Sequence, residues 1–128
     1  MKLLLDTHAF IWWDSDLARL SPRALSLCQN PENHLLLSVA SVWEMQIKLQ
    51  LGKLRLGLPL ATIIDGQRET NGIEILSIKL EHVLALETLP AHHKDPFDRL
   101  LIAQAKVEGI ALVSGDSIFS QYPVNLAW

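Results

Sequence analysis

Short apolar runs alternate with helix-forming segments along the chain, and this alternation constrains the fold more than any other feature of the sequence. We expect strands at residues 2–5, 34–39, 73–76 and 110–114, and a short last strand at 124–126. Strands that are apolar throughout are typical of parallel sheets with helices on both faces. The sequence therefore predicts an α/β fold with a central parallel sheet.

Length and composition favour one globular domain over residues 1–128. Hydrophobic residues make up 49% of the chain and charged residues 20%, as in ordinary globular proteins. The net charge of −3 argues against a dedicated nucleic-acid scaffold, although local basic groups and a bound metal would still allow nucleic-acid binding. The single cysteine, Cys28, fits a reducing compartment. No apolar run reaches the roughly 20 residues of a membrane span, so we expect a cytoplasmic protein.

The most informative helix signal lies between residues 92 and 105. Asp95 followed by Pro96 predicts an N-cap and a first helical residue. The helix is expected to run to about residue 108 and to end before Gly109. A second carboxylate, Asp98, lies in its first turn, where an acid interacts favourably with the positive helix end.

Capping and turn residues predict further helices at residues 22–29, 41–51, 58–71 and 79–88. Ser41 and Glu44 have the spacing of a capping box at the start of the second of these. Trp43 lies between them and is expected to pack under the sheet.

Carboxylates stand where the predicted strands end or the next helices begin. Ligands of parallel sheets bind at the carboxyl ends of the strands, which makes these side chains candidates for a functional site: Asp6, Glu44, Asp98 and Asp116. Each also has an ordinary structural explanation. Asp6 would cap the following helix, and Asp116 would stabilise a turn. Glu44 would complete the capping box, and Asp98 would interact with the helix dipole.

A cluster of carboxylates at one sheet edge needs a chemical reason. The acids would repel each other and raise each other's pKa values. Either protonation or a bound hard divalent cation would make such a cluster tolerable. Mg²⁺ prefers oxygen ligands and needs only one or two carboxylates plus a substrate phosphate. A cation held in this way activates water and neutralises charge on a phosphodiester. The acids therefore indicate metal-dependent chemistry on a phosphate ester.

Motifs in four parts of the chain together resemble the PIN-domain family, and within it the VapC toxins of bacterial toxin–antitoxin pairs. They are Asp6-Thr7-His8, the segment from Ser41 to Glu44, the segment from Asp95 to Ala105, and Ser114-Gly115-Asp116. The third is the most specific, and the resemblance runs over residues 2–128. It implies a three-layer α/β/α sandwich and a Mg²⁺- or Mn²⁺-dependent endoribonuclease.

The resemblance also implies catalytic roles. The family's acidic quartet matches Asp6, Glu44, Asp98 and Asp116. Asp6, Asp98 and Asp116 would hold the metal ion. Glu44 would help to ligate the ion, or would orient the water that attacks the phosphorus and leaves a 5′-phosphate and a 3′-hydroxyl.

Substrate contacts and partners are implied in the same way. Thr7 matches the family's small hydroxyl near the metal, and Ser114 matches the hydroxyl of its last motif. Arg99 would either pair with Asp95 or contact the RNA backbone. Lys48 would contact the backbone or belong to a solvated charged surface. Family members pair as homodimers and are neutralised by an antitoxin, so we expect RNA, a cognate antitoxin protein and a second copy as partners.

Other functions fit the same acids. A phosphoryl-transfer domain would use Asp6 as a nucleophile, but no second acid stands two residues after it. A non-catalytic regulatory or scaffold domain would use the acids only to bind magnesium. A nuclease that acts on single-stranded or structured DNA would share the chemistry and differ in substrate.

Overall fold

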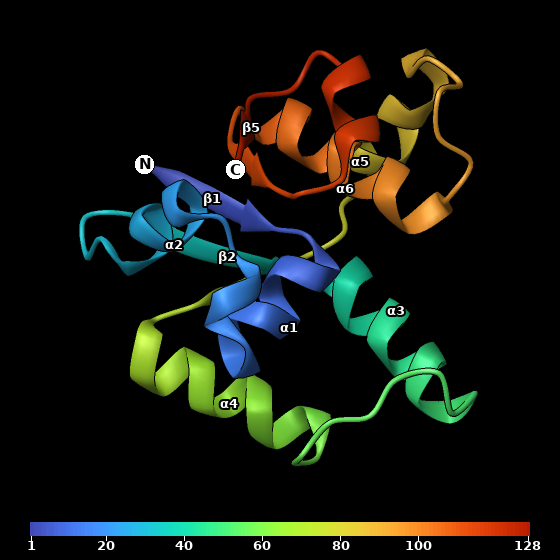
Figure 1. The fold of residues 1–128 in the computed structure, drawn as a ribbon. Coiled ribbons are helices and arrows are strands. Elements are labelled where there is room, and N and C mark those ends of the chain that lie inside the picture. Colours follow the sequence, from blue (N-terminus) through green and yellow to red (C-terminus); the bar gives the residue numbers. More distant parts are fainter.

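The protein forms a five-stranded, fully parallel sheet with the strand order β3-β2-β1-β4-β5 (Figure 1). The computed structural model describes residues 1–128. The strands are β1 (Lys2–Leu5), β2 (His34–Ser38), β3 (Glu74–Leu76), β4 (Ala111–Val113) and β5 (Leu126–Ala127). The expected parallel sheet is confirmed, although the bounds of β2, β3, β4 and β5 differ from the predicted ones by one or two residues.

Helices cover both faces of this sheet. They are α1 (Thr7–Ser15), α2 (Pro22–Gln29), α3 (Val39–Gln50), α4 (Leu60–Asn71), α5 (Leu80–Leu84) and α6 (Pro96–Glu108), with 3₁₀ turns η1 (Leu17–Arg19), η2 (Ala85–Thr88) and η3 (Ser117–Gln121). Helices α1, α2 and α4 lie on one side of the sheet, and α5 and α6 lie on the other (Figure 1). The three-layer α/β/α arrangement is therefore confirmed. No helix is long and apolar enough to cross a bilayer.

The strands supply one core to each helical layer because successive side chains point to opposite faces. Leu3 and Leu5 pack in a cluster with α1, α2 and α4, whereas Leu4 packs in a second cluster with α6. All three leucines are fully buried. The continuous apolar strands of the sequence thus reflect a sheet with no solvent-facing side.

Strand register brings three polar residues together at the carboxyl edge of the sheet. Leu5 of β1 is aligned with Leu37 of β2 and with Val113 of β4. The residue that follows each of these is polar and buried, and the three are Asp6, Ser38 and Ser114. The backbone N–H of Asp6 also donates to the carbonyl of Val113 at 3.0 Å, which fixes the start of α1 against β4.

The N-cap of helix α3 lies three residues earlier than predicted. Ser38 is its N-cap and accepts from the N–H of Ala40, so the capping box of Ser41 and Glu44 is wrong. The hydroxyl on the last residue of the strand satisfies one of the first free amides of the helix, so the helix starts directly after the strand. Glu44 therefore lies in the second turn of α3, and Ser41 is buried inside the helix with its hydroxyl unpartnered.

Trp43 is 57% exposed, so the expectation that it packs under the sheet is wrong. Starting α3 at Val39 turns this position outward. Its ring meets Phe97 of α6 edge to face, at 5.1 Å between ring centroids. The start of α6 itself is as predicted, because the Asp95 carboxylate accepts from the N–H groups of Phe97 and Asp98.

Candidate metal centre

Asp6 is a buried acid at the end of β1. Its carboxylate caps α1 by accepting from the N–H of Ala9 at 2.7 Å, and the residue is only 6% exposed. Burial raises the pKa of Asp6, while the Ser114 hydroxyl and the amide of Ala9 pull it down and the nearby Glu44 charge raises it further. The Asp6 carboxylate therefore caps a helix. Its negative charge is unfavourable in this buried position, and a bound cation would stabilise it.

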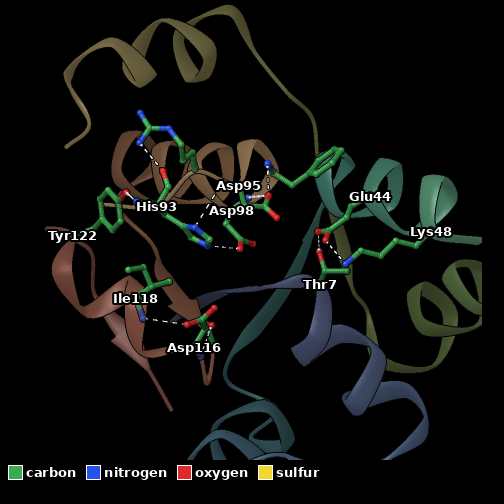
Figure 2. Close-up of polar contacts among 12 residues, drawn as sticks. Thr7, Glu44, Lys48, His93, Asp95, Asp98, Asp116, Ile118 and Tyr122 are labelled. Carbon is green, nitrogen blue, oxygen red and sulfur yellow. Dashed lines mark hydrogen bonds and ion pairs between the residues drawn. The ribbon is translucent and has the colours of Figure 1, made fainter. Parts of the chain in front are cut away.

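Glu44 is a second buried carboxylate, held from two sides. Thr7 Oγ1 donates to Glu44 Oε1 at 2.6 Å, and Lys48 Nζ lies 2.7 Å from Glu44 Oε2 (Figure 2). Thr7 is the first residue of α1, and Lys48 follows Glu44 by one turn of α3. Both oxygens are thus fixed, which orients the charge of Glu44 between Asp6 and Asp98, whose pKa values it raises.

Replacing Thr7 by valine is expected to destabilise the protein by about 1.5–3 kcal/mol, because a buried carboxylate loses a hydrogen bond and gains none from water. Equilibrium denaturation by urea measures this loss. Thr7→Ser keeps the hydroxyl and should cost less than half as much. Thr7→Ser loses only the methyl, so equal destabilisation by the two variants would mean that the hydrogen bond to Glu44 does not dominate the effect.

Asp98 and Asp116 approach each other from opposite sides of the edge. Asp98 lies in the first turn of α6, and Asp116 is the N-cap of η3, where it accepts from the N–H of Ile118. One ligand atom each of His93, Asp98 and Asp116 lies within 4.8 Å of the others. Figure 2 shows these three side chains pointing toward one another.

His93 is the residue that the sequence did not reveal. It precedes α6 in a loop, and its Nε2 lies 2.8 Å from Asp98 Oδ2. The loop is fixed by Tyr122, whose hydroxyl accepts from the N–H of His93 at 2.7 Å. The pair His92-His93 has no regular spacing to an acid, so only the folded loop brings the ring to Asp98.

Burial and the charge of Asp95 raise the pKa of Asp98 to about 6, against the pull of its His93 hydrogen bond. The folded carboxyl thus keeps its proton between its ordinary value of 3.8 and about 6, where the unfolded chain has lost it. This group therefore lowers the stability of the metal-free protein as pH rises through that window.

Asp98→Asn removes the ionisable carboxyl. Above pH 6 it should stabilise the metal-free protein by roughly 1–3 kcal/mol, after allowance for partial solvent screening. At pH 4, where the carboxyl of the folded wild type is protonated, it should have almost no effect. Melting temperatures of both proteins in chelator, from pH 4 to pH 8, give the difference. A difference in melting temperature between the two proteins that stays constant with pH would contradict the raised pKa of Asp98.

Arg99 and Lys48 are both already engaged. Arg99 Nη1 donates to the carbonyls of Pro90 at 2.9 Å and His93 at 3.3 Å, so the expected ion pair with Asp95 is wrong. Instead the guanidinium holds the loop that carries His93. Lys48 is about one-third exposed and paired with Glu44, so its ammonium group lies beside the acids rather than on a separate charged surface.

The chemistry of these donors fits a hard divalent cation. Carboxylate oxygens are the ligands that Mg²⁺ and Mn²⁺ prefer, and a neighbouring imidazole adds one nitrogen donor. Burial and mutual repulsion raise the pKa values of Asp6 and Asp98, which is the electrostatic cost that a bound cation offsets. The residues that could hold the ion are Asp6, Asp98 and Asp116.

A second group of potential ligands lies elsewhere but is internally satisfied. His82 is fully buried, and its Nε2 lies 2.8 Å from Glu108 while its Nδ1 accepts from the N–H of Lys79. The pKa of Glu108 is lowered, mainly by the hydrogen bond with His82. These contacts tie α5 to α6 and leave no imidazole nitrogen free for a metal.

Comparisons with known proteins agree with this fold. The model of the PIN domain family matches residues 3–125. Among solved structures, a chain of the VapBC2 complex from Rickettsia felis superposes with a TM-score of 0.72 and 17% identity, over 98% of this chain and 97% of that chain. A chain of DNA-bound VapBC from Salmonella typhimurium gives 0.69 and 14%, over 98% and 96%.

A chain of FitAcB from Neisseria gonorrhoeae gives a TM-score of 0.62 and 19% identity, over 97% of this chain and 95% of that chain. No curated protein matches the sequence. The structural likenesses describe the fold, and the family match spans nearly the whole chain. This chain therefore belongs to the PIN-domain family.

Proposed function

We propose that the protein is a metal-dependent endoribonuclease and the toxin of a type II toxin–antitoxin pair. The observation that carries this proposal is the convergence of four carboxylates, from β1, α3, α6 and the β4–η3 loop, on one edge of a parallel sheet in a PIN-family chain. Capping accounts for Asp6 and Asp116, but it does not explain why Glu44 and Asp98 lie beside them, where the Glu44 charge raises the pKa values of Asp6 and Asp98.

Asp6, Asp98 and Asp116 would hold a Mg²⁺ or Mn²⁺ ion. When bound, such an ion activates water and offsets the negative charge of the scissile phosphodiester. Glu44, fixed by Thr7 and Lys48, orients the attacking water in line with the bond that breaks. The water oxygen bonds to phosphorus, the bond from phosphorus to the 3′ oxygen breaks, and the products carry a 5′-phosphate and a 3′-hydroxyl.

The proposal extends to side chains around the acids. Ser114, whose hydroxyl lowers the pKa of Asp6 and accepts from the N–H of Asp116, would help to keep these carboxylates aimed at the ion. Thr7 would contribute by holding the Glu44 carboxylate in place through its hydrogen bond. Lys48 and Arg99 lie on either side of the acids and would contact RNA phosphates only after leaving part of their present partners.

Partners and location are proposed on the likeness to toxin–antitoxin complexes. The similar Rickettsia and Salmonella chains belong to VapBC complexes bound to DNA. We expect a cognate antitoxin that covers the acidic edge, a homodimer, and a cytoplasmic protein whose residues 1–128 form one domain.

Cleavage of matched oligonucleotides tests the function. A single-stranded RNA, a DNA of the same sequence and an RNA duplex are incubated with the protein and Mg²⁺ or Mn²⁺, and product ends are mapped. The proposal expects cleavage of the single-stranded RNA, with 5′-phosphate ends. Cleavage of the DNA alone would instead favour a DNA nuclease, and metal binding without any cleavage would favour a regulatory or scaffold domain.

A further inference from the structure

A small pocket lies directly beside the acidic centre. It encloses about 240 Å³, and two of its lining residues are Asp6 and Asp116. The rest of its wall comes from the start of α1, from η1 and from the end of the chain, through His8, Trp12, Arg19 and Trp128. None of these four residues has a role in the function proposed above.

The wall opposite the acids is aromatic. The rings of His8 and Trp12 are stacked, with centroids 5.6 Å apart and planes at 25°. Trp128 is tilted against Trp12 at 6.0 Å, and the Arg19 guanidinium carbon lies 5.9 Å from the centroid of a Trp12 ring. His8 and Arg19 are exposed and the two indoles are half-buried, so each of these side chains keeps part of its surface accessible to a ligand.

Gly115 explains why Trp128 lies so close to the acids. A Cβ atom built on Gly115 would stand 2.7 Å from Cε2 and Cζ2 of Trp128, closer than side chains can pack. The backbone angle φ of Gly115 is not positive, so its conformation would accept other residues. Glycine at this position therefore serves the approach of the indole to the loop between Ser114 and Asp116.

We propose that this pocket binds one nucleobase of the substrate, next to the phosphate that is cut. Two indoles and an imidazole offer π-faces on which any base can stack, with added attraction from the arginine. A volume of about 240 Å³ is below the roughly 300–1,000 Å³ of pockets for drug-sized ligands, and so suits a single ring system. The carboxylates that line it disfavour a phosphate there.

The residues that line both the pocket and the acidic centre indicate which base of the RNA would bind. Asp116 lines the pocket together with Asp6 and also belongs to the ligand cluster with His93 and Asp98, so the bound base would be a near neighbour of the scissile phosphate. A base reaches such a pocket only when it is unpaired and unstacked, which favours single-stranded RNA, loops and bulges over a duplex. This inference rests on the proposed nuclease function, but base binding needs neither metal nor cleavage.

The test therefore measures binding in chelator, where no cleavage occurs. Nucleoside 5′-monophosphates and base-free ribose 5-phosphate are titrated against the full-length protein by ligand-observed NMR. The nucleotides are expected to bind and ribose 5-phosphate is not. Trp12→Leu, Trp128→Leu and His8→Ala should each weaken nucleotide binding by about 5- to 100-fold.

Matched variants separate stacking from folding. His8 is exposed, so its replacement leaves the core intact. Trp12→Phe keeps an aromatic face and should bind within about threefold of the wild type, whereas Trp12→Leu should not. Trp43→Leu removes an exposed indole outside the pocket and should bind as the wild type does.

Nucleotide binding that is lost in the pocket variants and kept in Trp43→Leu supports the inference, even if the wild type cleaves no RNA and the nuclease proposal fails. Three results overturn it: no nucleotide binding, equal binding of ribose 5-phosphate, or unchanged binding by Trp12→Leu and Trp128→Leu. Binding of an arginine-rich peptide without nucleotide binding also overturns it, and assigns the pocket to a protein partner.

Discussion

Asp98→Asn is expected to abolish RNA cleavage, with a loss of about 10³-fold or more, while the protein stays folded. Asp98 is the carboxylate that approaches both Asp116 and the charge of Glu44, so its removal takes a ligand from the centre of the cluster. Loss of several kcal/mol of transition-state stabilisation corresponds to that factor. The amide is isosteric and can still accept from His93. The measurement is the cleavage rate of a single-stranded RNA at saturating Mg²⁺.

The variant should also be at least as stable as the wild type, because it removes a half-buried charge with acidic neighbours. Asp65→Asn is the matched control, since Asp65 is exposed on α4 and outside the cluster. It should cleave at the wild-type rate. Full activity of a folded Asp98→Asn variant would contradict the proposed mechanism.

Removal of divalent metal is expected to stop cleavage to the same degree, and added Mg²⁺ or Mn²⁺ should restore it. The same ions should stabilise the folded protein at pH 8, by about 2.7 kcal/mol at a concentration one hundred times the dissociation constant. Binding requires deprotonated carboxylates, so the stabilisation should shrink below the pKa of about 6 at Asp98. Melting temperatures with and without the ion measure this effect independently of activity.

Two comparisons make the stability measurement specific. In Asp98→Asn the shift in melting temperature on adding Mn²⁺ should largely disappear, whereas in Asp65→Asn it should remain. Glu108→Gln alters the other group of potential ligands and should leave the shift unchanged. A shift that survives Asp98→Asn but is lost in Glu108→Gln would place the metal at His82 instead.

Much of the fold could be predicted because it depends on local signals. Residues 3–5 and 35–37 are apolar on both faces, and this pattern is typical of a buried parallel sheet. Asp95 and Pro96 give the start of α6 because cap and first residue are set by local backbone bonding. From these elements alone, the sheet rule places Asp6 and Asp116 at one edge.

The errors arose where two residues compete for one local role. Ser38 and Ser41 are both acceptable caps, and only the length of β2 decides that Ser38 is used. That shift of three residues moved Glu44 into the second turn and Trp43 to the surface. The residue types at these positions allow either cap, so the sequence did not show at which residue the helix begins.

Contacts between distant segments were out of reach for a different reason. His93 meets Asp98 only because Tyr122 and Arg99 hold its loop. Similarly, Trp12 and Trp128 come together only when β5 is added beside β4. No pattern within either segment carries this information.

Anomalous scattering from a crystal grown with Mn²⁺ tests most directly whether the dispersed acids form one metal site. We expect a manganese peak within ligand distance of carboxylate oxygens of Asp6 and Asp98, on the side facing Asp116. A protein saturated with Mn²⁺ that shows no peak there, or shows its strongest peak beside His82 and Glu108, would contradict this expectation.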